Sequence, residues 1–125
     1  MADAEQQYEG SRMRQRHPRI HNEVHLDFIR GLPCISCGND IETQAAHLRS
    51  DDRMYGKTGA GMQQKPDDMW TLPLCGRCHD RQHTGNEMNF WTNLGVNPFV
   101  LALSLFAASG DYELAHEVIS RQVHR

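Results

Sequence analysis

The cysteines of this chain form two identically spaced pairs. Cys34 and Cys37 make up the first Cys-x-x-Cys pair, and Cys75 and Cys78 make up the second. A Cys-x-x-Cys turn directs both of its thiolates toward one point, and four thiolates complete the tetrahedral shell that Zn²⁺ prefers. The pattern therefore predicts a structural zinc site with these four ligands. The alternative is four unrelated buried or redox cysteines, although a redox centre would need only one pair.

The two cysteine pairs are far apart for a simple zinc ribbon. Residues 38–74 separate them, whereas about 15–20 residues are usual. The extra residues indicate an insertion between the two halves of the zinc site, and we expect that insertion to contain functional residues.

Two histidines follow the second cysteine pair. His79 comes directly after Cys78, and His83 lies four positions later. On a helix that begins near Cys75, the two imidazoles share one face, roughly 90° around from the thiolates. The pair could therefore bind one divalent ion or one phosphate, so that one helix serves two metal centres. The alternative is a pair of exposed polar histidines near the end of a helix.

Short helices and strands are expected to position these side chains. Apolar residues at every fourth position from Ile20 to Phe28 predict an amphipathic helix that leads to the first cysteine pair. Strands are expected over residues 41–48 and 70–74, the second interrupted by Pro73, with the polar, glycine-rich segment 49–68 as a long loop between them.

The rest of the chain is expected to be helical. Asn86 and Asp111 are suitable N-caps, Pro98 suits the first turn of a helix and Gly95 suits the end of one. The predicted helices cover residues 75–83, 87–94, 98–108 and the segment after Asp111. The expected fold class is α+β, with a core of residues 19–95 and a C-terminal helical pair, residues 96–125, packed on it.

The order of these features resembles the HNH endonucleases, and more narrowly the small phage and prophage HNH proteins related to the RecA-dependent nuclease of a temperate phage. The resemblance covers about residues 21–95. It rests on a Cys-x-x-Cys pair, a strand ending in Ala46-His47-Leu48, a glycine-rich segment, Lys-Pro-Asp-Asp ending at Asp68, and Leu-Pro-Leu followed by Cys75-x-x-Cys78-His79-x-x-x-His83.

The resemblance implies a ββα-metal core that is stabilised by zinc and cuts DNA. It also implies that a phage or prophage encodes the protein. It implies that His47 is the general base, that Asp68 fixes the ring of His47, and that His79 and His83 hold a catalytic divalent cation such as Mg²⁺, Mn²⁺ or Zn²⁺. Hydrolysis of a phosphodiester needs a base for water and a cation for the developing charge, so these roles are chemically coherent.

This sequence departs from the family pattern at two positions. Many HNH enzymes have Asp or His immediately before the base, where this chain has Ala46, and the central Asn of the family is absent near Asp68. Either two protein ligands hold the ion together with water and phosphate oxygens, or Asp67, Asp68 or His47 completes its shell.

The charges of the chain are unevenly distributed although the net charge is only -3. Residues 1–18 are expected to form an arm, acidic at its start and basic at its end. The basic residues could follow a phosphate backbone, and the alternative is a solvated arm without a partner. The candidate nucleic-acid-binding residues are Arg12, Arg14, Arg16 and Arg19, joined by His17, His21 and His25.

The composition is that of an ordinary globular protein of 125 residues, with 38% hydrophobic and 23% charged residues. The longest apolar run, residues 99–108, is much shorter than the ~20 residues of a membrane span. We expect a cytoplasmic location, where cysteines stay reduced. Besides a nuclease, the sequence is compatible with a non-catalytic zinc module that binds nucleic acid or a protein partner, and with a structural or regulatory phage protein.

Overall fold

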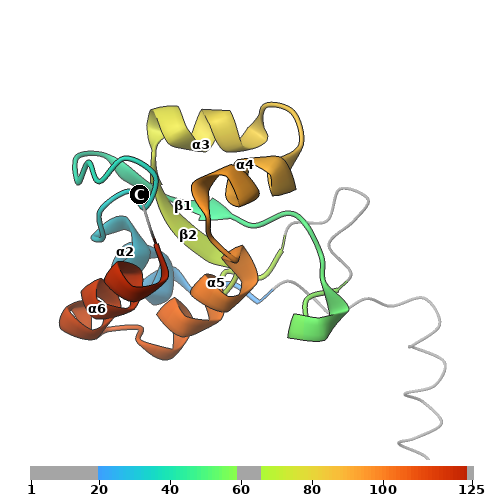
Figure 1. Ribbon diagram of the computed structural model, residues 1–125. Coiled ribbons are helices and arrows are strands. Elements are labelled where there is room, and N and C mark those ends of the chain that lie inside the picture. The colour runs from blue at the N-terminus through green and yellow to red at the C-terminus, as the bar shows by residue number, and fades with distance from the viewer. Residues whose placement is uncertain (1–19, 59–65, 124–125) are drawn as a thin grey trace, which may run out of the picture.

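The computed structural model describes residues 20–58 and 66–123. Within these ranges five α-helices surround a two-stranded antiparallel sheet, so the predicted α+β class is confirmed (Figure 1). The arm, including Arg12, Arg14, Arg16 and Arg19, lies outside the described residues.

The sheet pairs strand β1, Thr43–His47, with strand β2, Thr71–Cys75. Every residue of β2 is buried. The expected interruption at Pro73 is wrong, because β2 continues through it. The Pro73 carbonyl accepts a hydrogen bond from the Ile35 amide on the side away from β1, at 3.0 Å, so the missing N–H of proline costs no bond of the β1–β2 ladder.

The helices lie on two sides of this sheet (Figure 1). Helices α3 (Gly76–His83) and α4 (Glu87–Leu94) lie together on one side. The other side holds α2 (Glu23–Arg30), α5 (Pro98–Ala107) and α6 (Tyr112–Gln122). No single helix in the described part of the chain is long and apolar enough to cross a membrane; α4 and α5 reach that length only as a pair bent by 77°.

Side-chain caps fix where the helices begin. Asn86, Asn97 and Asp111 each accept a hydrogen bond from a backbone N–H in the first turn of the helix that follows. Gly95, with φ of 76°, ends α4 in the left-handed conformation that glycine adopts without strain. The predicted boundaries at Asn86, Gly95, Pro98 and Asp111 are confirmed.

The first helix differs from the prediction in its start and in its buried face. The side chain of Asn22 accepts a hydrogen bond from the His25 amide, so α2 begins at Glu23. Ile20 and Val24 are 63% and 79% exposed. The buried face of α2 instead consists of His25, Leu26, Phe28 and Ile29.

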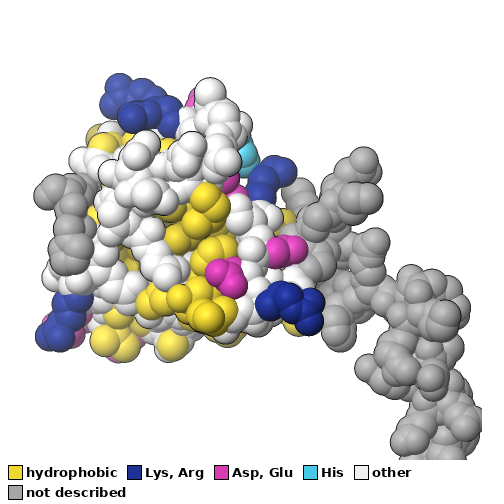
Figure 2. Space-filling model, turned by 45° about the vertical axis from the view of Figure 1, so that its right-hand side comes forward, with side chains coloured by type: hydrophobic (Ala, Val, Ile, Leu, Met, Phe, Trp, Pro, Cys, Tyr) yellow, Lys and Arg dark blue, Asp and Glu magenta, His cyan; other side chains and the backbone are white. Residues whose placement is uncertain are grey.

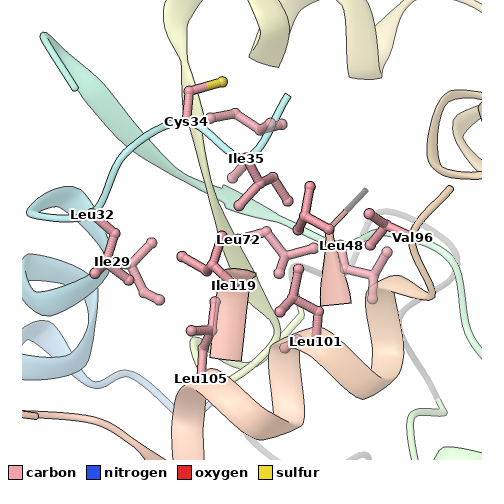
Figure 3. Packing of buried hydrophobic residues seen from close by; sticks show 14 of the residues in the cluster. Ile29, Leu32, Cys34, Ile35, Leu48, Leu72, Val96, Leu101, Leu105 and Ile119 are labelled. Carbon is pink, nitrogen blue, oxygen red and sulfur yellow. The ribbon is translucent and has the colours of Figure 1, made fainter. Parts of the chain in front are cut away.

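One hydrophobic core joins the sheet to the helices on both sides (Figure 3). Leu72 of β2 lies in the same cluster as Trp91 of α4, Leu101 and Leu105 of α5, and Ile119 of α6. The C-terminal helices therefore share the core that supports β2, and β2 in turn leads directly into α3.

The segment after β1 is more ordered than the expected long loop. Asp52 and Lys57 form an isolated β-bridge around a short 3-10 helix, Arg53–Tyr55. Lys57 is only 2% exposed, and its Nζ lies 2.9 Å from a carboxylate oxygen of Asp51. A buried ammonium needs such a partner because an unpaired buried charge is costly. Residues 59–65 lie outside the described part of the chain.

Candidate functional site

The four cysteines lie together and are not joined as disulfides. Their sulfur atoms all lie within 4.8 Å of one another, and the Sγ atoms of Cys37 and Cys75 are 3.8 Å apart. Zinc–sulfur bonds of ~2.3 Å in a tetrahedron place the sulfurs about 3.8 Å apart. The cluster of Cys34, Cys37, Cys75 and Cys78 is therefore compatible with a structural metal ion such as Zn²⁺.

Local backbone geometry explains why the two pairs face one point. The first pair sits in a turn closed by the hydrogen bond from the Gly38 amide to the Cys34 carbonyl, 2.8 Å, with Gly38 at φ 81°. The second pair sits where β2 meets α3, with Cys75 at the N-cap and Cys78 in the first helical turn. Three of the four thiols are buried; Cys37 is exposed.

Two thiols of the cluster, those of Cys75 and Cys78, have pKa values shifted in opposite directions. A hydrogen bond from the Cys78 backbone amide, with further thiol contacts, lowers the pKa of Cys75 to about 7. Burial raises the pKa of Cys78 to about 12. Because a bound cation favours thiolates strongly, zinc binding is expected to release the Cys78 proton.

The predicted base and its predicted orienting residue are in contact. His47 is the last residue of β1, and its Nε2 lies 2.9 Å from Oδ1 of Asp68, just before β2. The Asp68 side chain is fully buried, whereas that of His47 is 20% exposed. A buried carboxylate bonded to a partly exposed imidazole restricts the orientation of the ring.

Asp68 also binds the segment that precedes α2, which sequence reasoning did not foresee. Its Oδ2 accepts a hydrogen bond from the Asn22 amide at 2.7 Å and lies 2.8 Å from Nδ1 of His21. The neighbouring Asp67 accepts a hydrogen bond from the Ile20 amide at 2.7 Å. His21, predicted to join the basic arm, is thus a second imidazole on the carboxylate that contacts His47.

The predicted histidine pair lies on α3, beside the sheet. The rings of His79 and His83 have centroids 4.8 Å apart. Burial, followed by the positive charge of His83, lowers the pKa of His79, and Arg49 and His47 lower it further. Gln82, on the same helix, donates a hydrogen bond from Nε2 to the His47 carbonyl at 3.1 Å, so α3 lies against the end of β1.

In the described part of the chain, no third protein ligand is gathered beside the histidine pair. Among residues 20–58 and 66–123, the four cysteines are the one group of three or more His, Cys, Asp or Glu side chains with all ligand atoms within 4.8 Å. Ala46 is fully buried in the core, where a charged ligand would be costly. Asp67 and Asp68 bind the segment before α2. This geometry favours two protein ligands completed by water or phosphate oxygens.

The carboxylate of Glu87 on α4 holds the segment that follows His47 in place. Glu87 accepts hydrogen bonds from both the amide and the hydroxyl of Ser50, at 2.9 and 2.8 Å, and from the Arg49 amide. It also accepts one from Gln82 Nε2 at 2.6 Å, and the same Nε2 donates to the His47 carbonyl at 3.1 Å. Trp91 Nε1 donates to Glu87 as well.

A Glu87→Ala variant is expected to lose about 2–3 kcal/mol of unfolding free energy, because several partly buried donors would lose their acceptor. Urea denaturation measures the loss. Glu117→Ala is the matched control, since the ion pair of Glu117 with Arg121 is exposed and worth about 0.3–0.5 kcal/mol. Equal losses in the two variants would contradict this role of Glu87.

The prediction that His25 contacts phosphate is wrong. His25 is 1% exposed, and its Nδ1 lies 2.8 Å from the Ser109 hydroxyl. Burial lowers its pKa, although the negative charge of Asp68 opposes the shift. A buried neutral imidazole cannot contact phosphate, so His25 belongs to the packing of α2 and not to a basic surface.

The fold and the cysteine cluster define a small α+β protein suited to holding a metal ion. Residues 9–109 match the model of the family described as "Protein of unknown function (DUF968)". The match covers most of the chain, and the protein belongs to this family. No curated protein and no solved structure gives a significant match.

Proposed function

We propose that this protein is a metal-dependent endonuclease of the HNH type, encoded by a phage or prophage, that hydrolyses phosphodiester bonds in DNA. The observation that carries the proposal is the contact of His47 at the end of β1 with the buried Asp68, next to a helix bearing His79 and His83. The strand–strand–helix order is the one that the resemblance to HNH enzymes implies.

In this proposal His47 accepts a proton from the attacking water while Asp68 stabilises the resulting imidazolium. The water oxygen bonds to phosphorus, the bond between phosphorus and the leaving oxygen breaks, and solvent protonates that oxygen. A divalent cation, when bound, stabilises the charge on the scissile phosphate. His79 and His83 would hold that cation, and the cysteine cluster would hold a separate structural zinc.

The test is cleavage of supercoiled plasmid by zinc-loaded protein with Mg²⁺, Mn²⁺ or extra Zn²⁺ added in turn. Nicked or linear product is expected with at least one ion and none without added ion, because the weakly held cation is lost on dialysis. Protein with its full zinc content that cuts plasmid with none of the three ions would contradict the proposal.

The basic end of the arm is expected to bind the DNA backbone. Deleting residues 1–16 should weaken DNA binding and flatten its dependence on salt, since fewer counterions would be released. The arm's charges do not enter the chemistry, so the cleavage rate at saturating DNA should be unchanged. Fluorescence anisotropy at several salt concentrations measures the slope. An unchanged slope would show that the arm does not touch phosphate.

A non-catalytic zinc module that binds nucleic acid or protein is the second candidate. It is favoured by the net charge of -3 and by the lack of a third ligand beside the histidine pair in the described residues. In one view of the described residues, acidic and basic side chains lie near one another around a hydrophobic area (Figure 2). DNA binding without cleavage in the plasmid assay would favour this candidate.

A further inference from the structure

Gln44 links the sheet to the helix of the histidine pair. It lies in β1, and its exposed amide reaches α3, where its Oε1 lies 2.7 Å from Nδ1 of His79. The other end of the amide, Nε2, lies against the start of α3, because a Cβ added to Gly76 would be 3.4 Å from it. The contact joins residues 35 positions apart.

This contact determines which ring nitrogen of His79 carries the proton. An amide oxygen can only accept a hydrogen bond, so Nδ1 of His79 must be the donor. In a neutral imidazole one nitrogen is a donor and the other is an acceptor, so Nε2 of His79 keeps its lone pair. An unrestrained neutral histidine in water favours the opposite tautomer, with the proton on Nε2.

We propose that Gln44 is a positioning residue that holds His79 in the Nδ1–H tautomer and presents Nε2 as its metal-binding atom. The proposal rests on the assignment of His79 and His83 as cation ligands. Metal-binding histidines commonly donate their second N–H to an acceptor that fixes the ring, and loss of that acceptor typically weakens metal binding about 10–100-fold. Gln44 has this relation to His79, and no feature of the sequence singled it out.

The first test reads the tautomer directly and needs neither the catalytic cation nor activity. Nitrogen-15 NMR of histidine-labelled, zinc-loaded protein at alkaline pH is expected to show His79 as the Nδ1–H form. Gln44→Leu should convert His79 to the Nε2–H form, whereas Gln44→Glu should keep Nδ1–H because a carboxylate also accepts. Asn93→Leu, which removes an exposed amide on α4, is the matched control. An Nε2–H tautomer in the unmodified protein would overturn the proposal.

The second test measures Mn²⁺ binding to the same zinc-loaded variants by calorimetry. Gln44→Leu should bind Mn²⁺ about 10–100-fold more weakly, Gln44→Glu at least as tightly as the unmodified protein, and Asn93→Leu unchanged. Equal affinity in Gln44→Leu and the unmodified protein would overturn the role of Gln44 and leave the nuclease proposal standing. Protein that binds Mn²⁺ in this Gln44-dependent way but cuts no plasmid would contradict the nuclease and support Gln44.

Discussion

A Cys78→Ser variant is expected to lose both its zinc and its cooperative fold. Zinc binding to four thiolates is coupled to folding and contributes about 10–16 kcal/mol in small structural sites, which is comparable to the ~5–15 kcal/mol of net stability typical of a domain. Cys78 is 1% exposed and lies where β2, α3 and the first cysteine turn meet. Circular dichroism during heating and elemental analysis measure the two losses.

The control for this prediction is Arg77→Ala, because Arg77 lies between the two cysteines of the same pair and is exposed. This variant should keep its zinc and its melting transition. Removal of zinc from the unmodified protein by a strong chelator should unfold it, and added Zn²⁺ should restore the fold. A Cys78→Ser protein that melts cooperatively without zinc would show that the cluster is not a structural metal site.

A His47→Ala variant is expected to lose about 10²–10⁴-fold in cleavage rate, the usual effect of removing a general base. Its zinc content should be unchanged and its stability nearly so, because Asp68 keeps the hydrogen bond from Asn22 and the contact with His21. Plasmid cleavage at saturating cation, with melting curves of the same samples, separates the two effects. His116→Ala, at an exposed histidine of α6, is the matched control.

The histidine pair should respond differently from the base. His79→Ala and His83→Ala remove a cation ligand and leave His47 in place, so each should raise the concentration of divalent ion needed for cleavage and be partly rescued by excess ion. Rescue of His47→Ala by excess ion would contradict its assignment as the base. Full activity in all three variants would favour the zinc-module candidate.

The features that the sequence determined by itself are those fixed within a few residues. The two Cys-x-x-Cys turns and the caps at Asn86 and Asp111 depend on local hydrogen bonds and turn geometry, which do not change with the rest of the fold. The strands and α3 were placed within about two residues for the same reason. The contact of His47 with Asp68 was anticipated only through the resemblance to HNH enzymes.

Tertiary structure alone decided which faces are buried and which distant side chains meet. An amphipathic helix could bury either Val24 or His25. In the folded protein the polar His25 is buried and Val24 is exposed. The ring of His25 lies against Phe106 of α5 and the hydroxyl of Ser109. The contact of Gln44 with His79 and those of Glu87 with residues 49–50 join positions more than 30 apart. Such pairs depend on how the chain returns on itself, because spacing along the sequence determines only which residues share a turn or a helix face.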